Sequence, residues 1–256
     1  MQHRNDDILL YVAIGDAVAA ATEYVRRSRY PDVIEAALRL DRYIQHPTHL
    51  DVKPGRYTDD AQFSIAVAEA LLDGMPLTEA LFANMFVRSF KRDPRAGYAR
   101  GFYSVLKKVR DGSELQRTVG ATNPGTSKPW RCSPKNGAAM RAVPLGVLRD
   151  PRTIMRVSDV QANVTHDTLE GRFGSRAVAL MSHFALYSDT DFSVMYELLE
   201  EYLHHDMWTI GINLRQPRRR PVKQPASNTV HAVFHLLTTC SPLPPAPLST
   251  PLSLVM

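Results

Sequence analysis

The sequence predicts an all-α protein that folds as a single compact multi-helix domain. Apolar residues recur with helical spacing along most of the 256-residue chain, and no segment shows the strict alternation of a half-buried strand. No repeat of fixed length divides the chain. A chain of this length with 44% hydrophobic residues can bury a core without disulfides or structural metal ions.

Local signals set the bounds of the expected helices. Pro31 stands at a favoured first helical position, and Gly74 provides a stop signal after an apolar pattern. Residues 118–141 are rich in Gly, Pro, Ser and Thr and predict a loop, and helical signals resume near Ala138. The expected helices cover residues 8–24, 31–45, 58–72, 76–90, 97–112, 150–166, 168–187, 189–205 and 227–240.

The last residues differ from the rest of the chain in composition. Residues 241–256 contain five prolines and no charged residue. Proline removes a backbone donor and clashes with the preceding helical turn, so the helix before this segment cannot continue into it. We therefore expect a helical domain over residues 1–240 and a proline-rich disordered tail over residues 241–256.

Charge and cysteine usage restrict the class of partner. The net charge of +5 and the pI near 9.3 favour an anionic ligand. The basic segment 215–225 is typical of a solvated linker, so we expect no nucleic-acid partner. Asp16 interrupts the apolar run 8–21, which fits neither a signal peptide nor a membrane span, so we expect no membrane partner. Cys132 and Cys240 lack a metal-binding spacing and predict reduced thiols in a cytoplasmic protein.

Acidic residues collect in two short segments. Asp16 and Glu23 are seven residues apart and share a face if their helix is unbroken, which fits either the polar edge of a buried helix or a functional acid pair. Thr58, Asp59 and Asp60 directly precede an apolar helical pattern. They form either a helix cap supported by the macrodipole or a set of hard oxygen ligands for a divalent cation.

A loop followed by a helix start lies further along the chain. Asn136-Gly137 is a turn dipeptide within the segment 133–146, and a helix N-terminus there offers backbone N–H groups to an anion such as a diphosphate. A plain capped loop is the alternative. His166 follows at a distance; it is either a phosphate donor or a structural histidine.

Together these segments resemble one known family. The chain carries G-D-A-x-x-x-x-x-E from Gly15, T-D-D from Thr58, N-G-A-A-M-R-x-x-P-L-G from Asn136 and T-H-x-x-x-x-G from Thr165, in that order. This combination resembles the ADP-ribosylglycohydrolase family, which includes the dinitrogenase-reductase-activating glycohydrolases and the eukaryotic ADP-ribosyl-acceptor hydrolases. The resemblance extends from about Ile8 to about Thr239.

The resemblance implies an all-α fold with a two-metal centre of Mg²⁺ or Mn²⁺. It implies metal ligation by Thr58, Asp59 and Asp60, with Glu23 at the metal centre near the scissile ribose. Ser133, Asn136 and Gly137 match the loop that holds ADP-ribose, and His166 matches the histidine near its phosphates. The residues that the resemblance assigns to the site are Glu23, Thr58, Asp59, Asp60, Ser133, Asn136, Gly137 and His166.

The implied reaction is the hydrolytic removal of ADP-ribose from a modified protein side chain or a related ADP-ribosyl compound. The expected partner is an ADP-ribosylated protein or a small molecule that contains ADP-ribose. Bond cleavage at the anomeric carbon develops positive charge, which nearby carboxylates stabilise. We expect Glu23 to act as the acid or base and Asp60 to act as the second catalytic carboxylate.

Three positions depart from the family pattern. Ala19 and Ala21 replace a glycine and a proline, and Lys135 replaces the glycine before Asn-Gly. The family's C-terminal glycine-glycine-aspartate-x-aspartate-threonine motif, which provides about half of the metal ligands, is absent. We expect a frameshift or truncation near Cys240, with weakened metal binding and impaired catalysis.

Two other classes of function remain open at this point. One is a non-catalytic module that binds ADP-ribose or a nucleotide through residues 133–137 and His166. The other is a structural protein comparable to crystallin-like relatives of the family. Ligand binding without turnover would indicate the first, and absence of both would indicate the second.

Overall fold

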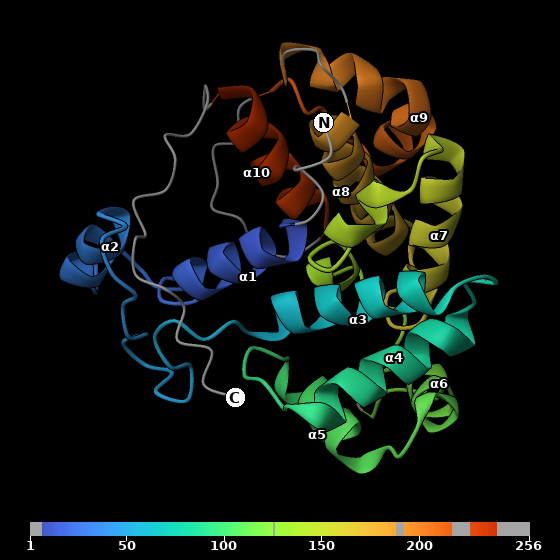
Figure 1. Ribbon diagram of the computed structural model, residues 1–256, viewed down its shortest axis with the longest axis horizontal. Coiled ribbons are helices and arrows are strands. Elements are labelled where there is room, and N and C mark those ends of the chain that lie inside the picture. The colour runs from blue at the N-terminus through green and yellow to red at the C-terminus, as the bar shows by residue number, and fades with distance from the viewer. Residues whose placement is uncertain (1–6, 125, 188–191, 217–225, 240–256) are drawn as a thin grey trace.

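The computed structural model describes residues 7–124, 126–187, 192–216 and 226–239, and within these residues the chain is helical and contains no β-strand (Figure 1). The all-α prediction is confirmed. Three short 3₁₀ helices accompany the α-helices: η2 (Asn136–Ala138), η3 (Val143–Val147) and η4 (Phe192–Val194). The α-helices are α1 (Ile8–Ala19), α2 (Pro31–Leu38), α3 (Asp59–Asp73), α4 (Glu79–Arg92), α5 (Arg100–Lys108), α6 (Gly112–Gly120), α7 (Pro151–Asn163), α8 (Leu169–Tyr187), α9 (Met195–Ile210) and α10 (Ala226–Thr239).

Helix α3 crosses the middle of the molecule and separates two groups of helices (Figure 1). Below it in the view lie α4, α5 and α6, and above it lie α7, α8, α9 and α10. The upper group is organised around α8, which packs against α7, α9, α10 and η3. Helix α3 packs against α4 in one group and against η3 in the other, and it also contacts α1.

Apolar side chains explain the central positions of α3 and α8. Helix α8 has no wide polar face, and Phe173, Leu180 and Met181 are almost completely buried. Phe63 of α3 is equally buried and stacks on Phe86 of α4 with ring centroids 4.6 Å apart. These contacts place the first turn of α3 at the junction between the two groups.

An ion-pair network connects three helices of the upper group. Arg176 of α8 contacts Asp159 of α7 at 2.5 Å and Asp206 of α9 at 2.6 Å. All three side chains are largely shielded from water, so each charge depends on its partner for compensation. The network ties both α7 and α9 to α8.

The N-terminus of α3 is capped by a residue from another helix. Thr58 occupies the N-cap position, but its side chain accepts no capping hydrogen bond. Instead the Asp16 carboxylate of α1 accepts from Thr58 N at 2.7 Å, from Ala61 N at 2.9 Å and from Thr58 Oγ1 at 2.7 Å. The expectation that Thr58 caps the helix is therefore correct for its position and wrong for its side chain.

The expectation that Asp16 and Glu23 lie on one face of a continuous helix is wrong. Helix α1 ends at Ala19, and Glu23 lies in the following turn, beside Tyr24 with a φ of +57°. The alanines from 19 to 21 favour continuation of the helix, but local turn bonds such as Thr22 Oγ1 to Ala19 O replace the helical pattern.

Several helix bounds also differ from the expectation. Helix α2 ends at Leu38, before Leu40 adopts a left-handed φ of +54°. Helix α4 begins only after Thr78, which accepts a capping bond from Leu81 N. The expected helix over residues 97–112 is α5 alone, and the sequence prediction missed α6, which Asp111 caps. Near Ala138 the chain forms the short η2 and η3 rather than an α-helix.

Some predictions fall outside the described residues. The tail over residues 241–256 lies there, as do Cys240 and most of the basic segment 215–225. Among the described helices, none combines the length and the apolar character that crossing a bilayer requires.

Replacement of Asp16 by alanine tests the cap of α3. The amides of Thr58 and Ala61 lose their acceptor, and we expect Asp16→Ala to lower the free energy of unfolding by about 1–2 kcal/mol. Amide hydrogen exchange at Ala61 should accelerate. Asp150, which caps α7 through Thr153 N, provides the matched control, because Asp150→Ala removes a cap without touching α3. Unchanged exchange at Ala61 in Asp16→Ala would contradict this account.

Candidate functional site

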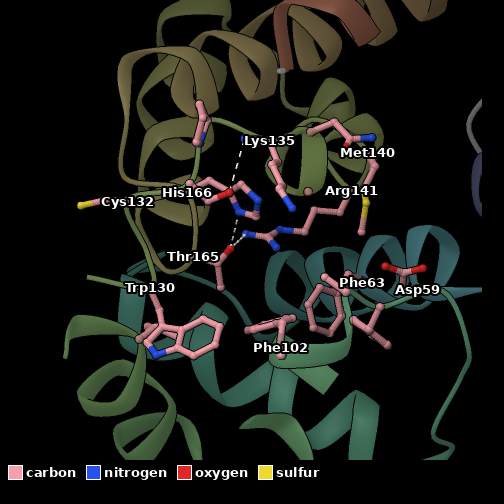
Figure 2. A pocket seen from close by; sticks show the side chains of 18 of the residues that line it. Asp59, Phe63, Phe102, Trp130, Cys132, Lys135, Met140, Arg141, Thr165 and His166 are labelled. Atoms are coloured by element: carbon pink, nitrogen blue, oxygen red, sulfur yellow. Dashed lines mark hydrogen bonds between the residues drawn. The ribbon is translucent and has the colours of Figure 1, made fainter. Parts of the chain in front are cut away.

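A cavity of about 640 Å³ opens where the two helix groups meet at the start of α3 (Figure 2). Segments distant in the sequence form its wall: the turn after α1, the first turn of α3, the loop between α6 and η2, and the turn that follows α7. Among the residues that line it are Glu23, Asp59, Asp60, Ser133, Asn136, Gly137 and His166.

Carboxylates form one end of the cavity, which we call the acidic end: Glu23, Asp59 and Asp60. Asp59 and Asp60 occupy the first turn of α3, whose orientation the Asp16 cap fixes. Gly97 makes room for Asp59: it has a φ of +108°, and a Cβ there would lie 1.8 Å from Asp59 Oδ1. Only glycine fits both this backbone conformation and this contact.

The acidic end holds uncompensated negative charge. Burial, together with the neighbouring charges of Asp16 and Glu23, raises the pKa of Asp60 to about 7. The pKa of Asp59 is also raised well above its usual value, first by burial and then by Asp60. Burial raises the pKa of Glu23 as well. Like charges in a dry site resist ionisation unless a cation accompanies them.

The donor set fits one side of a hard-cation site. Within the described residues, no hydrogen bond or ion pair between side chains engages the Asp60 carboxylate, which faces the cavity together with Asp59. The Thr58 hydroxyl donates its hydrogen to Asp16, which leaves oxygen lone pairs for a cation. No group of three His, Cys, Asp or Glu side chains arranged to hold a metal ion occurs in the described part of the chain. The oxygen donors suit Mg²⁺ or Mn²⁺, but they form an incomplete set.

His46 holds the turn that carries Glu23. Its Nδ1 accepts from the backbone N–H groups of Thr48 at 3.1 Å and His49 at 2.9 Å. The ring hydrogen therefore resides on Nε2, which donates to Glu23 O at 3.0 Å. The role of His46 was not predicted from the sequence, because its contact with Glu23 O joins two loops that are separated in the chain.

The opposite end of the cavity is a loop held by two helices. Thr168 Oγ1, just before α8, donates to Ser133 O at 3.2 Å, and Ala226 N of α10 donates to Pro134 O at 2.9 Å. Lys135 N donates to Ser133 Oγ at 3.4 Å, which keeps the loop compact. Lys135, which departs from the family pattern, lines the cavity here and adds positive charge.

His166 lies against this loop with its ring over Gly137. A Cβ at position 137 would approach His166 Cε1 to 2.5 Å and Nε2 to 2.8 Å, so only glycine permits the contact. Burial lowers the pKa of His166 to about 3, and the positive charges of Arg141 and Lys135 act in the same direction. The imidazole is therefore neutral at physiological pH.

A buried arginine lies behind His166. The side chain of Arg141 is 1% exposed, and its Nε donates to Gln161 Oε1 at 2.6 Å. Its Nη2 donates to Gln161 O and to Thr165 Oγ1, each at 2.9 Å. Burial lowers its pKa to about 9, so it remains a cation. Its recorded hydrogen bonds in the described residues go to Gln161 and Thr165, and none goes to a carboxylate. The sequence placed this residue in a motif but gave it no role.

Aromatic side chains connect the two ends. Phe63, Tyr98, Phe102 and Trp130 line the cavity, and Figure 2 shows Trp130 and Phe102 on one side of it, with His166, Lys135 and Arg141 across from them. Trp130 packs against Gly101, where a Cβ would lie 2.9 Å from the indole ring. This apolar wall was not predicted, because its members come from α3, the segment between α4 and α5, α5 itself and the long loop after α6.

The structure brings together all but one of the residues predicted for the site. Thr58 does not line the cavity, because its hydroxyl turns to Asp16. The roles of the predicted residues as metal, substrate or catalytic groups stay predictions.

Comparison with known proteins identifies the family. A sequence model described as ADP-ribosylglycohydrolase matches residues 4–244, nearly the whole chain. The chain belongs to the ADP-ribosylglycohydrolase family. The resemblance inferred from the ordered motifs is thereby confirmed.

Curated relatives of this family member include ADP-ribosylhydrolase ARH3 of Danio rerio, 32% identical over 57% of this chain and 40% of the relative. The Homo sapiens protein of that name is 28% identical over 59% of this chain and 44% of its own length. ADP-ribosylarginine hydrolase Tri1 of Serratia proteamaculans is 26% identical over 62% of this chain and 40% of the relative. The chain thus spans about half the length of the curated relatives it matches.

Substitution at Gly137 tests the contact with His166. A methyl group there displaces the ring, and we expect Gly137→Ala to lower the free energy of unfolding by about 1–3 kcal/mol. The His166 ring resonances should shift in the same variant. Gly120→Ala is the control, because no atom lies within 4 Å of its added Cβ. Equal effects of the two substitutions in urea denaturation would show that the close approach is unimportant.

The raised pKa of Asp60 predicts a pH-dependent stability in chelator. The unfolded carboxyl ionises near 3.8 and the folded one near 7, so the folded state loses stability as pH rises from 4 to 7 and keeps that loss above 7. Asp60→Asn should therefore stabilise the metal-free protein by on the order of 4 kcal/mol above pH 7, with the gain fading toward pH 4.

Thermal denaturation in chelator at several pH values measures this gain. Asp73, exposed at the other end of α3, supplies the control substitution Asp73→Asn. A stabilisation by Asp60→Asn that is the same at pH 4 and pH 8 would contradict the assignment of charge repulsion.

Proposed function

We propose that the protein is an ADP-ribosyl hydrolase that releases ADP-ribose from a modified side chain. One observation carries the proposal: a single cavity has carboxylates at one end, cationic and hydrogen-bonding groups at the other, and an aromatic wall between them. ADP-ribose has matching parts, because its diphosphate is anionic, its base is aromatic, and its terminal ribose carries the bond to be cleaved.

The charge distribution sets the orientation of the substrate in this proposal. The diphosphate lies at the loop of residues 133–137, where His166, Lys135 and the buried Arg141 favour negative charge. The terminal ribose then lies at the acidic end. The reverse orientation would place the terminal ribose beside Lys135 and His166, away from Glu23, Asp59 and Asp60, which are the carboxylates that line the cavity in the described residues.

Glu23 and Asp60 carry the proton transfers in the proposed reaction. Cleavage at the anomeric carbon needs an acid for the leaving group and a base for water, while carboxylates stabilise the developing positive charge. Burial raises the pKa of Glu23, and this direction favours the protonated form that a general acid needs. His46 positions the Glu23 turn through the backbone carbonyl and takes no part in the chemistry.

A divalent cation belongs to the proposal. Asp59 and Asp60 line the cavity and would hold Mg²⁺ or Mn²⁺; Thr58, which lies beside the cavity wall, would join them through the oxygen lone pairs that its hydrogen bond to Asp16 leaves free. The cation would supply positive charge that orients the ribose hydroxyls. Support comes from the unpaired negative charge and hard oxygen donors at the start of α3.

Modified arginine is the acceptor linkage we propose to test first, because one of the relatives is named an ADP-ribosylarginine hydrolase. The proposed substrate is an ADP-ribosylated protein or a small molecule that contains ADP-ribose. We also propose a cytoplasmic site of action, which the free thiol of Cys132 supports.

Binding of ADP-ribose without turnover is a second candidate function. It is favoured by one observation: the aromatic wall and the loop end are well formed, whereas the acidic end lacks three metal-holding side chains in the described residues.

Release of free ADP-ribose from an ADP-ribosylated arginine peptide tests the proposal. We expect release in Mg²⁺ or Mn²⁺ that stops in chelator and falls on the order of 100-fold in Glu23→Gln and in Asp60→Ala. Asp73→Asn is the control for a carboxylate outside the cavity. Binding of ADP-ribose with no release would favour the second candidate, and absence of both would contradict the assignment of the cavity.

A further inference from the structure

The hydrogen bonds around Thr165 have a fixed direction. Arg141 Nη2 can only donate, so the contact of 2.9 Å obliges Thr165 Oγ1 to accept. The Thr165 hydroxyl keeps one hydrogen of its own. Its other contact is His166 Nδ1 at 2.8 Å, and Figure 2 shows Arg141, Thr165 and His166 in this sequence.

The direction of the hydrogen bond from Thr165 determines which ring nitrogen of His166 carries the hydrogen. A hydroxyl can accept two hydrogen bonds, but among the described residues His166 Nδ1 is the only recorded acceptor within hydrogen-bond distance of Thr165 Oγ1. The hydroxyl hydrogen is satisfied only if it goes to Nδ1, which makes that nitrogen the acceptor. In a neutral imidazole the other nitrogen then carries the hydrogen. His166 Nε2 lies against Gly137 in the loop that lines the cavity.

Two features of the surroundings stabilise this arrangement. Arg141 is anchored at three points, on Gln161 Oε1, Gln161 O and Thr165 Oγ1, and Gln161 is itself bonded to Ser175 Oγ, so the donor cannot turn away. The cations Arg141 and Lys135 both face His166, which disfavours a second proton on the ring. The ring is therefore a neutral donor rather than an imidazolium.

We propose that Thr165 is a positioning residue that fixes His166 in the Nε2–H tautomer, with Arg141 imposing the direction, so that the ring presents a hydrogen-bond donor to an anionic diphosphate oxygen. The part that concerns the diphosphate rests on the proposed function. The tautomer itself is a property of the protein without ligand, so the two parts fail separately.

Two other histidines provide internal references for the test. His46 holds its hydrogen on Nε2, because Nδ1 accepts two backbone N–H groups. His183 Nδ1 lies 3.0 Å from Gly146 O and must donate to that carbonyl, so its hydrogen is on Nδ1. All three rings are largely shielded from solvent, and their ¹⁵N spectra display both tautomers in one sample.

The experiment is a long-range ¹H–¹⁵N spectrum of the full chain without ligand, with the His166 signals assigned by their loss in His166→Gln. We expect His166 to show the same pattern as His46 and the opposite of His183. A His166 pattern that matches His183, or that of a doubly protonated ring at neutral pH, would overturn the proposal without reference to any ligand or variant.

Variants of Thr165 then test the positioning role. Thr165→Val keeps the shape and removes the hydroxyl, so we expect the His166 tautomer to become mixed and the dissociation constant of ADP-ribose to rise about tenfold. Thr165→Ser keeps the hydroxyl and should restore both. An unchanged tautomer and affinity in a folded Thr165→Val protein would overturn the proposal. If the tautomer changes as expected and wild-type protein does not bind ADP-ribose, the proposed function fails while the tautomer assignment stands.

Discussion

The carboxylate of Asp16 joins two helices at the point where the cavity begins. Three donors from the start of α3 converge on it, so the first turn of α3 is held in place by α1 and not by its own N-cap side chain. The cap has an electrostatic consequence, because it adds a buried acid beside Asp59 and Asp60. The pKa of Asp16 is itself raised by burial, although its three hydrogen bonds oppose that rise. A favourable cap thus contributes to the unfavourable charge of the acidic end.

The two ends of the cavity carry opposite and separately uncompensated charges. Three carboxylates face the cavity at one end. At the other, Arg141 is buried, and none of its recorded hydrogen bonds in the described residues goes to a carboxylate. Arg141 lies over the ring of Phe86 at 4.2 Å, a contact that stabilises the cation without neutralising it. Charges separated in this way favour a ligand that carries its negative charge at the Arg141 end of the cavity, together with a cation at the acidic end.

The sequence predicted the fold class because helical periodicity is a local property. Most of the residues that it predicted for the site line the cavity, because ordered motifs preserve the chemistry of a family. Helix ends were less predictable. Residues 19–21 are alanines and favour a helix, but local turn bonds replace the helical pattern after Ala19, so Glu23 lies on a turn instead of a helix face. His46, Arg141 and the aromatic wall could not be predicted, because each acts through contacts between segments far apart in the chain. Thr58 illustrates the same limit, since its residue type predicts a cap that another helix provides.

A crystal structure of the protein grown with ADP-ribose and Mn²⁺, with anomalous scattering used to locate manganese, tests the central claim most directly. The claim is that one cavity binds ADP-ribose with its diphosphate at the loop of residues 133–137 and its terminal ribose at the acidic end. The account predicts the diphosphate within hydrogen-bond distance of His166 Nε2 and manganese beside Asp59 and Asp60. ADP-ribose bound in the reverse orientation, or bound outside the cavity, would contradict it.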